Sequence, residues 1–309
     1  MREKAIKIKR KRCASDWFLD IFKVVFLVLV TVICVYPFWN IFVVSINDAT
    51  DALRGGLYFL PRKLSLASYK DILGRATFLH GILITVLRTA IGTPLAVLVT
   101  TALAYVLSRK ELLFRKQLNL FFIFTMYFGG GMVPYYMVLK SLGMLNNFIV
   151  FIFPNLVSVY NMILVKNYIE GMPAEIFESA KIDGAGEYTI FFKMVLPLSK
   201  PVISALGIFT EVGTWNDYTQ TLYYTKSADI QTLSYYMLSI TKASASAASL
   251  GETMSAGASS VLTTMSNSAA NYKTIELACM VLSALPLIIV YPFAQKFFEK
   301  GLMVGSVKG

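Results

Sequence analysis

The amino-acid sequence predicts an all-α integral membrane protein with six membrane-spanning helices, and two observations lead to this fold class. The first is composition: 56% of the 309 residues are hydrophobic and only 15% are charged, whereas a soluble domain carries about 25% charged residues. The second is that the apolar residues form runs long enough to cross a bilayer, which takes about 20 residues of helix. The expected spans are residues 20–46, 81–107, 118–140, 147–166, 201–223 and 274–296.

The first span follows a strongly basic N-terminal segment, residues 1–19, which begins MREKAIKIKRKR. Because Lys and Arg beside a span stay on the cytosolic side, this segment predicts cytosolic termini, the tail 297–309 included. The cluster also fits contact with anionic membrane lipid, so the net charge of +11 indicates membrane topology and no nucleic-acid partner. The outside segment 48–80 argues against this orientation, because it carries basic residues of its own. These are Arg54, Arg62, Lys63, Lys70 and Arg75.

Local signals mark several further elements. Pro37 predicts a kink in the first span, and LASYKDIL (66–73) predicts a short helix on the outside. In the third span, GGGMVP (129–134) must interrupt regular helix; its glycines either allow close helix packing or line a pathway. The outside segment 225–273 is rich in Ser and Ala, which fits an amphipathic helix or a mobile loop, and we favour a partly helical segment.

The inside segment 167–200 contains a short helix that Pro173 begins and Gly184 ends. A helix of this length is marginal in water by itself, so we expect it to dock on a partner. Docking would bury apolar side chains such as Phe177, each contributing about 1.5–3 kcal/mol. It would also let Glu178 accept charge-assisted hydrogen bonds from the partner.

The stretch ESAKIDGAGEYTIFFKMVLP (178–197) resembles the cytosolic signature of permease subunits in binding-protein-dependent ATP-binding cassette (ABC) importers. That family pattern is E-A-A, three residues, G, nine residues, I-x-L-P. The spacing matches throughout, and Ser179 and Met194 replace Ala and Ile with side chains of tolerable volume. The resemblance implies the type I importer permease (MetI-like) fold and a helix that couples the chain to an ATPase. The coupling residues it implies are Glu178, Ser179, Ala180, Asp183, Gly184, Leu196 and Pro197.

Three other stretches resemble the carbohydrate-uptake, maltose-type branch of this family. They are TWNDY (214–218), the ending GLMVGSVKG (301–309), and GGGMVPYYMVLKSLGMLNN (129–147), which looks like permeases for oligosaccharides and polysaccharides such as alginate. The resemblance implies transport by alternating access, with a second homologous permease, an ATPase dimer that holds ATP and Mg, and an extracellular sugar-binding protein. It also implies that the outside segment 225–273 reaches the binding protein and that the chain lies in a bacterial plasma membrane.

Polar and aromatic residues within or near the spans are candidates for the sugar pathway. Aromatic side chains favour sugar faces and amide or acidic groups bind hydroxyls, although packing or interfacial anchoring is the more common role for any single aromatic residue. Arg88 and Glu211 lie inside spans, where charge is costly; they line the pathway or form a structural ion pair. The full set is Trp215, Asn216, Asp217, Tyr218, Tyr127, Tyr135, Tyr136, Glu211 and Arg88.

The chain carries no recognisable catalytic constellation. No phosphate-binding glycine loop with lysine and no HExxH is present, and the cysteines predict neither a disulfide framework nor a metal site. We therefore expect a transport subunit that is not an enzyme and holds no cofactor or metal. The alternatives are an integral-membrane enzyme or regulator, or an ion-driven secondary transporter, which would need paired discontinuous helices and buried carboxylates.

Overall fold

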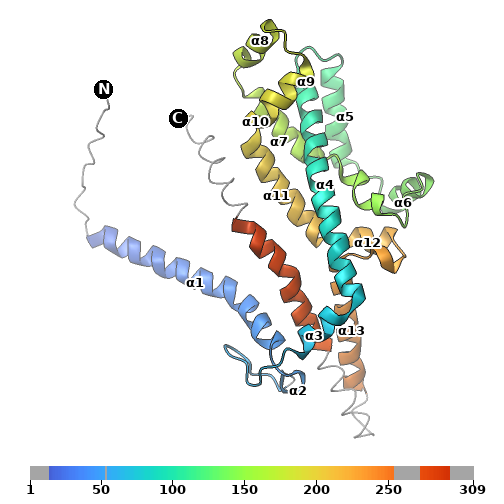
Figure 1. Ribbon diagram of the computed structural model, residues 1–309. Coiled ribbons are helices and arrows are strands. Elements are labelled where there is room, and N and C mark those ends of the chain that lie inside the picture. The colour runs from blue at the N-terminus through green and yellow to red at the C-terminus, as the bar shows by residue number, and fades with distance from the viewer. Residues whose placement is uncertain (1–13, 53, 254–271, 293–309) are drawn as a thin grey trace.

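The computed structural model describes residues 14–52, 54–253 and 272–292. In this part of the chain the architecture is all-helical, apart from an isolated β-bridge between Asn47 and Leu64. Figure 1 shows an elongated bundle in which the long helix α4 (Ala76–Ser108) connects two ends. The short helices α8 (Ala174–Ile182) and α9 (Glu187–Ile190) lie at one end, and α2 (Ala49–Ala52) and α3 (Ala67–Gly74) lie at the other. The short helix expected at LASYKDIL is α3.

Among the described residues, three helices are long and apolar enough to cross a membrane by themselves: α1 (Ala14–Ser45, its apolar part Trp17–Ser45), α4, and the C-terminal helix Tyr272–Pro292. Helix α1 contains Pro37, leans away from the other helices in Figure 1, and has no buried residue in its most apolar window. Such a surface is stable only in lipid or against another membrane protein.

Three further spans are broken, which gives up to six spans in the described residues when each bent pair counts as one. The helices of the pairs are bent by 116°, 42° and 77°. The pairs are α5 (Arg115–Tyr127) with α6 (Met132–Ser141), the 3₁₀ turns η1 (Phe148–Phe151) and η2 (Phe153–Asn155) with α7 (Val159–Glu170), and the run Glu187–Leu198 with α11 (Lys200–Asn216). That last run comprises α9, the π-helical turn η3 (Phe191–Val195) and α10 (Leu196–Leu198).

The break in the third span lies where the glycines predicted it. Helix α5 ends at Tyr127, and Gly131 precedes α6 with a φ of +82°. A Cβ built on Gly129 or Gly131 would meet nothing within 4 Å, so close packing of these glycines has no support among the described residues. The 116° bend means that the expected crossing 118–140 is not one straight helix.

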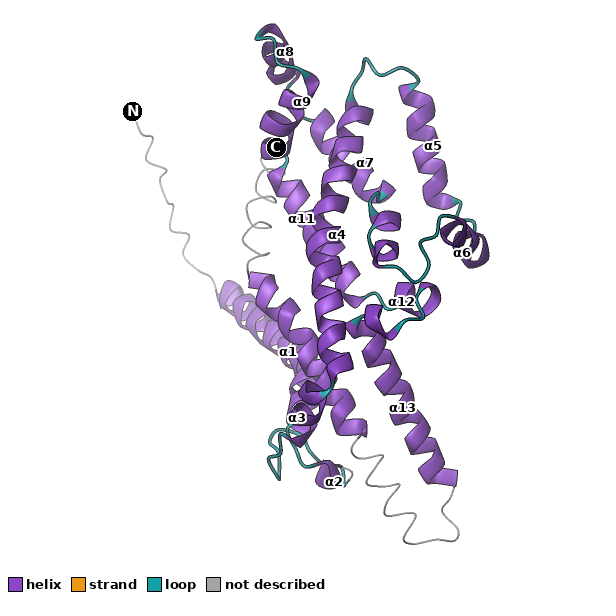
Figure 2. Ribbon diagram, turned by 45° about the vertical axis from the view of Figure 1, so that its right-hand side comes forward, coloured by secondary structure: helices purple, strands orange, loops and turns teal. Residues whose placement is uncertain are grey.

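The remaining elements are α12 (Thr219–Tyr224), η4 (Ala228–Ile230) and α13 (Leu233–Thr253). The outside segment 225–273 is thus partly helical, and its residues 254–271 lie outside the described residues, as do the basic start and the tail 297–309. Figure 2 shows α13 directed away from α12 toward the end that carries α2 and α3.

Buried side chains form a core at each end of α4. One cluster, near α8 and α9, includes Tyr105, Met162 and Ile190. The other, toward α3, gathers Phe78 and Trp215 with residues of α13 and the helix Tyr272–Pro292. Because both cores use α4, this helix fixes the spacing between the two ends of the described chain.

Three of the five basic residues of segment 48–80 lie beside acidic side chains. Arg62 lies 3.0 Å and Arg54 4.0 Å from the Asp51 carboxylate, and Arg75 lies 2.6 Å from Asp71. Because Arg54 and Arg62 share one carboxylate, the segment keeps a net positive charge and still opposes the expected orientation. The orientation itself stays a prediction.

Candidate functional site

Helix α8 ends in a glycine cap. Gly184 has a φ of +78°, its N–H donates to the Lys181 carbonyl at 3.0 Å, and the Ala185 N–H donates to the Ala180 carbonyl at 2.9 Å. This pair of bonds is the Schellman motif, which needs a left-handed residue at the position of Gly184. Pro173 stands at the other end, immediately before the helix. The predicted limits of the helix are therefore confirmed, and its direction is set by its own caps.

One face of α8 packs on the chain's own membrane helices. Ala180 is buried, and Phe177 packs against the same core. The Arg109 guanidinium lies between two rings, 4.9 Å from the centroid of Tyr105 and 5.0 Å from that of Phe177, where a cation is attracted to both. Phe177 is half-buried by this chain and also lines a cleft beside Glu178, so burial of the rest of its ring by a partner stays a prediction.

Ion pairs extend this attachment into α9. Glu187 accepts hydrogen bonds from the Tyr105 hydroxyl and, at 3.0 Å, from Arg109 Nη2. The Lys181 ammonium lies 3.5 Å from Glu187 and 3.3 Å from Glu111. These contacts join α8, α9 and the end of α4.

The opposite face of α8 and the following loop point away from the bundle. Glu178 and Ser179 are exposed there, and Glu178 has no hydrogen bond or ion pair with the described residues. Two large apolar side chains accompany them: Ile182 is 86% and Tyr188 84% exposed. Sequence reasoning missed this pair, although an isoleucine between Lys and Asp at a helix end is a signal that could have found it.

The segment turns sharply between α8 and α11. Leu196 packs on the core, whereas Pro197 is exposed. The run Glu187–Leu198 meets α11 at an angle of 77°, and the residue at the corner, Ser199, is fully buried. The Tyr168 hydroxyl, on α7, donates to the Leu198 carbonyl at 3.2 Å. The connection into α11 is therefore sharply angled and packed.

Arg88 belongs to α4, and its side chain lies fully buried against the C-terminal end of α11. Its Nη2 donates to the backbone carbonyls of Thr214, at 2.5 Å, and Asp217, at 2.6 Å. Its guanidinium also lies 5.5 Å from the centroid of the Phe151 ring. The last carbonyls of a helix carry partial negative charge, so Arg88 caps α11. The sequence suggested that Arg88 lines the pathway or forms an ion pair with Glu211, and neither hypothesis described a helix cap. Glu211 is not among the polar partners of Arg88 in the described residues.

Trp215 is a packing residue. Its side chain is 7% exposed within the buried cluster toward α3, and its Nε1 donates to the Ser283 carbonyl at 3.2 Å. Its own carbonyl accepts a bond of 2.6 Å from the Ser234 hydroxyl. Asn216 is exposed and donates to the Val212 carbonyl at 3.1 Å. Trp215 therefore joins α11, α13 and the C-terminal helix and does not reach a cavity.

A cleft of about 640 Å³ opens between α7 and α11. Asp217 lines it and also accepts bonds from the Thr219 amide, at 2.8 Å, and the Thr219 hydroxyl, at 2.5 Å. Sequence reasoning missed the other polar lining residues, although four of them lie close together in the apolar fourth span. These four are Asn155, Ser158, Tyr160 and Asn161, and the others are Thr210 and Thr214 of α11 and Gln220 of α12.

The remaining aromatic candidates lie apart from this cleft. The rings of Tyr135 and Tyr136 of α6 are tilted against that of Tyr224, with centroids 5.7 Å and 6.4 Å from the Tyr224 centroid. Tyr127 is 74% and Tyr218 40% exposed. The structure therefore does not gather the predicted pathway residues at one site.

Glu211 is half-buried on α11 and has no polar partner among the described residues. A carboxylate at this depth in a span needs water or a partner from another chain. Within the described residues, no three His, Cys, Asp or Glu side chains gather as metal ligands.

Comparison with known proteins places this geometry in a family. A family model described as "Binding-protein-dependent transport system inner membrane component" matches residues 72–304. The chain is 35% identical over 290 residues to "Protein LplC" of Bacillus subtilis, covering 94% of this chain and 95% of that protein. It is 36% identical over 287 residues to "Polygalacturonan/rhamnogalacturonan transport system permease protein YtcP" of the same organism, covering 92% and 96%.

A solved structure has the same fold. It belongs to a bacterial ABC transporter involved in the import of the acidic polysaccharide alginate, with a TM-score of 0.80 and 25% identity. The similarity covers 94% of this chain and 100% of that chain. The broken helices and the short helices at one end are therefore a shared architecture.

Proposed function

Because the chain belongs to the family of binding-protein-dependent transport system inner membrane components, we propose that it is one permease subunit of an ATP-driven importer for an oligosaccharide or related complex carbohydrate. Its relatives are ABC transporter permease subunits and not enzymes, so ATP hydrolysis belongs to a partner ATPase, which holds ATP and Mg. Family membership and the apolar helices make it a multi-pass membrane protein. The membrane is the bacterial plasma membrane.

The substrate class rests on two kinds of support. The named substrates of the similar permeases are polygalacturonan, rhamnogalacturonan and arabinooligosaccharides. The cleft between α7 and α11 offers amide, hydroxyl and carboxylate groups beside an exposed tyrosine, Tyr160, and sugars present both hydroxyls and apolar ring faces to such groups. We propose that this cleft is this subunit's wall of the sugar pathway.

Coupling would pass through α8. The exposed side with Glu178, Ile182 and Tyr188 docks on the ATPase, and the packed side transmits the movement through Arg109 and Glu187 to α4. The angled run Glu187–Leu198 carries it to α11, which lines the cleft. A bundle with two packed arrangements can then open toward either side of the membrane in turn.

The other partners have surfaces of their own. The exposed apolar helix α1 suits lipid and a second homologous permease. Helix α13 is held to α4 at its start, where the Leu233 amide donates to Thr85 Oγ1 at 2.9 Å. We propose that the continuation of this outside segment contacts the extracellular sugar-binding protein.

Purification of the intact complex tests this function. The tagged chain should co-elute with an ATPase and a second permease, and the reconstituted complex should take up a pectin-type or arabinose-type oligosaccharide only with ATP and the sugar-loaded binding protein. Uptake by the chain alone, driven by an ion gradient, would contradict the proposal.

The docking face yields a first mutational prediction. Glu178→Lys should lower ATPase retention in detergent by about tenfold, since reversing a charge in contact with a partner costs roughly 1–3 kcal/mol. The matched control is Glu175→Lys, an exposed carboxylate in the first turn of the same helix. Glu187 is unsuitable as a control, because its internal ion pairs would also be lost. Equal retention in the Glu175 and Glu178 variants would show that Glu178 is not at the contact.

The cleft yields a second prediction. Tyr160 is 60% exposed and lines the cleft, so Tyr160→Ala should weaken sugar uptake by about tenfold through loss of a stacking surface worth roughly 1.5 kcal/mol, while the complex still assembles. Phe153→Ala is the control, because Phe153 is 51% exposed nearby but does not line the cleft. Unchanged uptake kinetics in Tyr160→Ala would remove this face from the pathway.

A further inference from the structure

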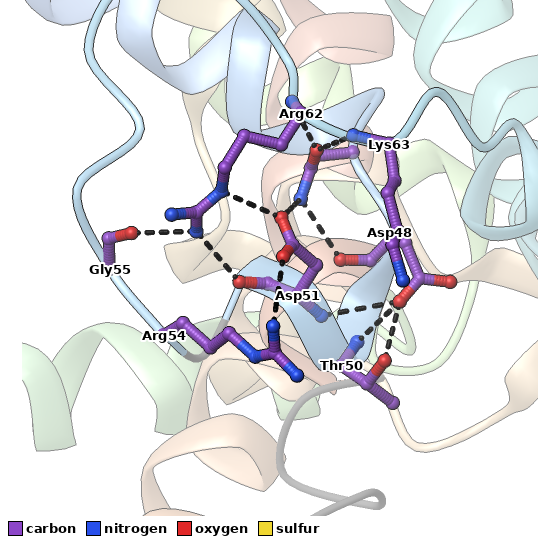
Figure 3. Close-up of polar contacts among 8 residues, drawn as sticks. Asp48, Thr50, Asp51, Arg54, Gly55, Arg62 and Lys63 are labelled. Atoms are coloured by element: carbon purple, nitrogen blue, oxygen red, sulfur yellow. Dashed lines mark hydrogen bonds and ion pairs between the residues drawn. The ribbon is translucent and has the colours of Figure 1, made fainter.

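The loop that follows α1, residues 46–65 and here called the outer loop, has a rigid polar base (Figure 3). The Asn47 side-chain oxygen accepts hydrogen bonds from the amides of Arg62, at 3.0 Å, and Lys63, at 2.9 Å. The Asp48 amide donates to the Lys63 carbonyl at 2.8 Å. The Asp48 carboxylate accepts from the Thr50 amide at 3.1 Å. Residues at the two ends of the loop are thus tied together directly.

A buried carboxylate lies at the centre of this base. Asp51 is 5% exposed and accepts bonds of 3.0 Å each from Asn47 Nδ2 and Arg62 Nε. Arg62 Nη2 continues to the carbonyls of Asp51, at 3.1 Å, and Gly55, at 2.7 Å. Figure 3 shows the Arg62 side chain reaching across the loop to the backbone near Asp51 and Gly55. A loop built in this way presents its tip in one conformation.

The tip folds back along α1. The Leu57 carbonyl accepts a bond of 2.6 Å from Asn40 Nδ2, and the Phe59 carbonyl one of 3.0 Å from Trp39 Nε1. The Phe59 ring lies 5.8 Å from that of Tyr36. Tyr36 precedes the end of α1 at Ser45 by about 13 Å of helix at 1.5 Å per residue. The tip therefore returns to the level of residues that belong to the membrane span.

At that level the tip exposes only large apolar or aromatic side chains. Tyr58 is 62%, Phe59 68% and Leu60 75% exposed. Three such neighbours on a rigid loop mark an interaction surface. The exposed cation Arg54 stands behind them at the base, with its side chain 75% exposed. In a membrane leaflet, the cationic base of such a loop would meet the anionic headgroups while the apolar tip meets the acyl chains.

We propose that this tip, Tyr58, Phe59 and Leu60, inserts into the outer leaflet of the membrane and anchors the outer end of α1. The support is the continuity with α1, whose most apolar stretch has no buried residue. Irregular backbone at membrane depth needs partners for its carbonyls, and the bonds from Asn40 and Trp39 supply them at the tip. The occupant is thus lipid acyl chain, with anionic headgroups near Arg54 and Lys63.

The experiment uses the full-length chain with Cys13, Cys34 and Cys279 changed to alanine. An environment-sensitive fluorophore is attached at Leu60→Cys, and the protein is reconstituted into phosphatidylglycerol–phosphatidylethanolamine vesicles with brominated acyl chains. Lys70→Cys on α3, exposed on the same side, and Tyr188→Cys, exposed at the other end, are matched controls. We expect about a twofold loss of fluorescence at position 60 and none at the controls, because an interfacial anchor lies roughly 5–10 Å into the leaflet.

Bromine position adds a depth measurement. Atoms placed near the headgroup end of the chain should quench the label at position 60 more than atoms near the chain terminus. Equal quenching at all three sites would overturn the proposal. So would a label at position 60 that ignores the brominated lipid and responds to added binding protein, because the tip would then be a protein contact.

Discussion

Replacing Gly184 with valine should uncouple sugar uptake from ATP hydrolysis. A β-branched residue at a φ of +78° costs roughly 1–2 kcal/mol or more, and relief requires opening the cap that directs the end of α8. In the reconstituted complex, uptake per ATP hydrolysed should fall about tenfold, the change that corresponds to 1.4 kcal/mol. The measurement is paired: sugar uptake and phosphate release from the same vesicles.

Two variants separate backbone geometry from side-chain bulk. Gly186 has a φ of −71°, and a Cβ built there meets nothing within 4 Å, so Gly186→Val should keep the wild-type ratio. Gly184→Asn should keep part of it, because asparagine tolerates the left-handed region. Normal coupling in Gly184→Val would show that the cap does not transmit the movement.

Arg88→Met should have the largest effect on stability. It leaves the half-buried carbonyls of Thr214 and Asp217 without the donor that both now share, and a buried group left unsatisfied costs roughly 1–3 kcal/mol. The expected loss is about 1–3 kcal/mol, read as a lower thermal unfolding temperature and a smaller monodisperse fraction in detergent.

The comparison variants are Arg88→Lys and Arg54→Met. Lysine keeps the charge but lacks the planar fork that reaches two carbonyls, so it should fall between wild type and Arg88→Met. Arg54 has a side chain that is 75% exposed, and its replacement should leave the unfolding temperature unchanged. An Arg88→Met protein as stable as Arg54→Met would mean that the α11 end needs no cap.

Apolar runs were sufficient to locate the long helices, because hydropathy reports how much chain avoids water. The helix Ala76–Ser108 contains the expected span 81–107, and Tyr272–Pro292 overlaps 274–296. Hydropathy does not report the angle between consecutive helices. The glycines at 129–131 predicted a break, but the 116° bend depends on what the helices on each side pack against.

The sequence was sufficient to predict those parts of the site whose conformation depends only on the local backbone. Gly184 could be assigned a left-handed conformation because a helix end requires one, whatever surrounds it. Phe177 and Arg88 could not be placed, since their partners are distant in sequence: Arg109 in one case and the carbonyls of Thr214 and Asp217 in the other. Backbone carbonyls carry no residue-specific signal, so no sequence pattern pointed to them.

The attachment of α11 at its two ends has a mechanical consequence. Its outer end is pinned to α4 by Arg88 and to the C-terminal helix by Trp215, while its inner end meets the coupling segment at the 77° corner. A rod pinned at one end and pushed at the other pivots, and displacement grows with distance from the pivot, over about 25 Å for a helix of this length. A push from the ATPase side would therefore swing Lys200 and Pro201 widely while Thr214 stays nearly still. If movement of α11 opens and closes the pathway, the part of α11 that moves is its inner end, and its outer end is the pivot.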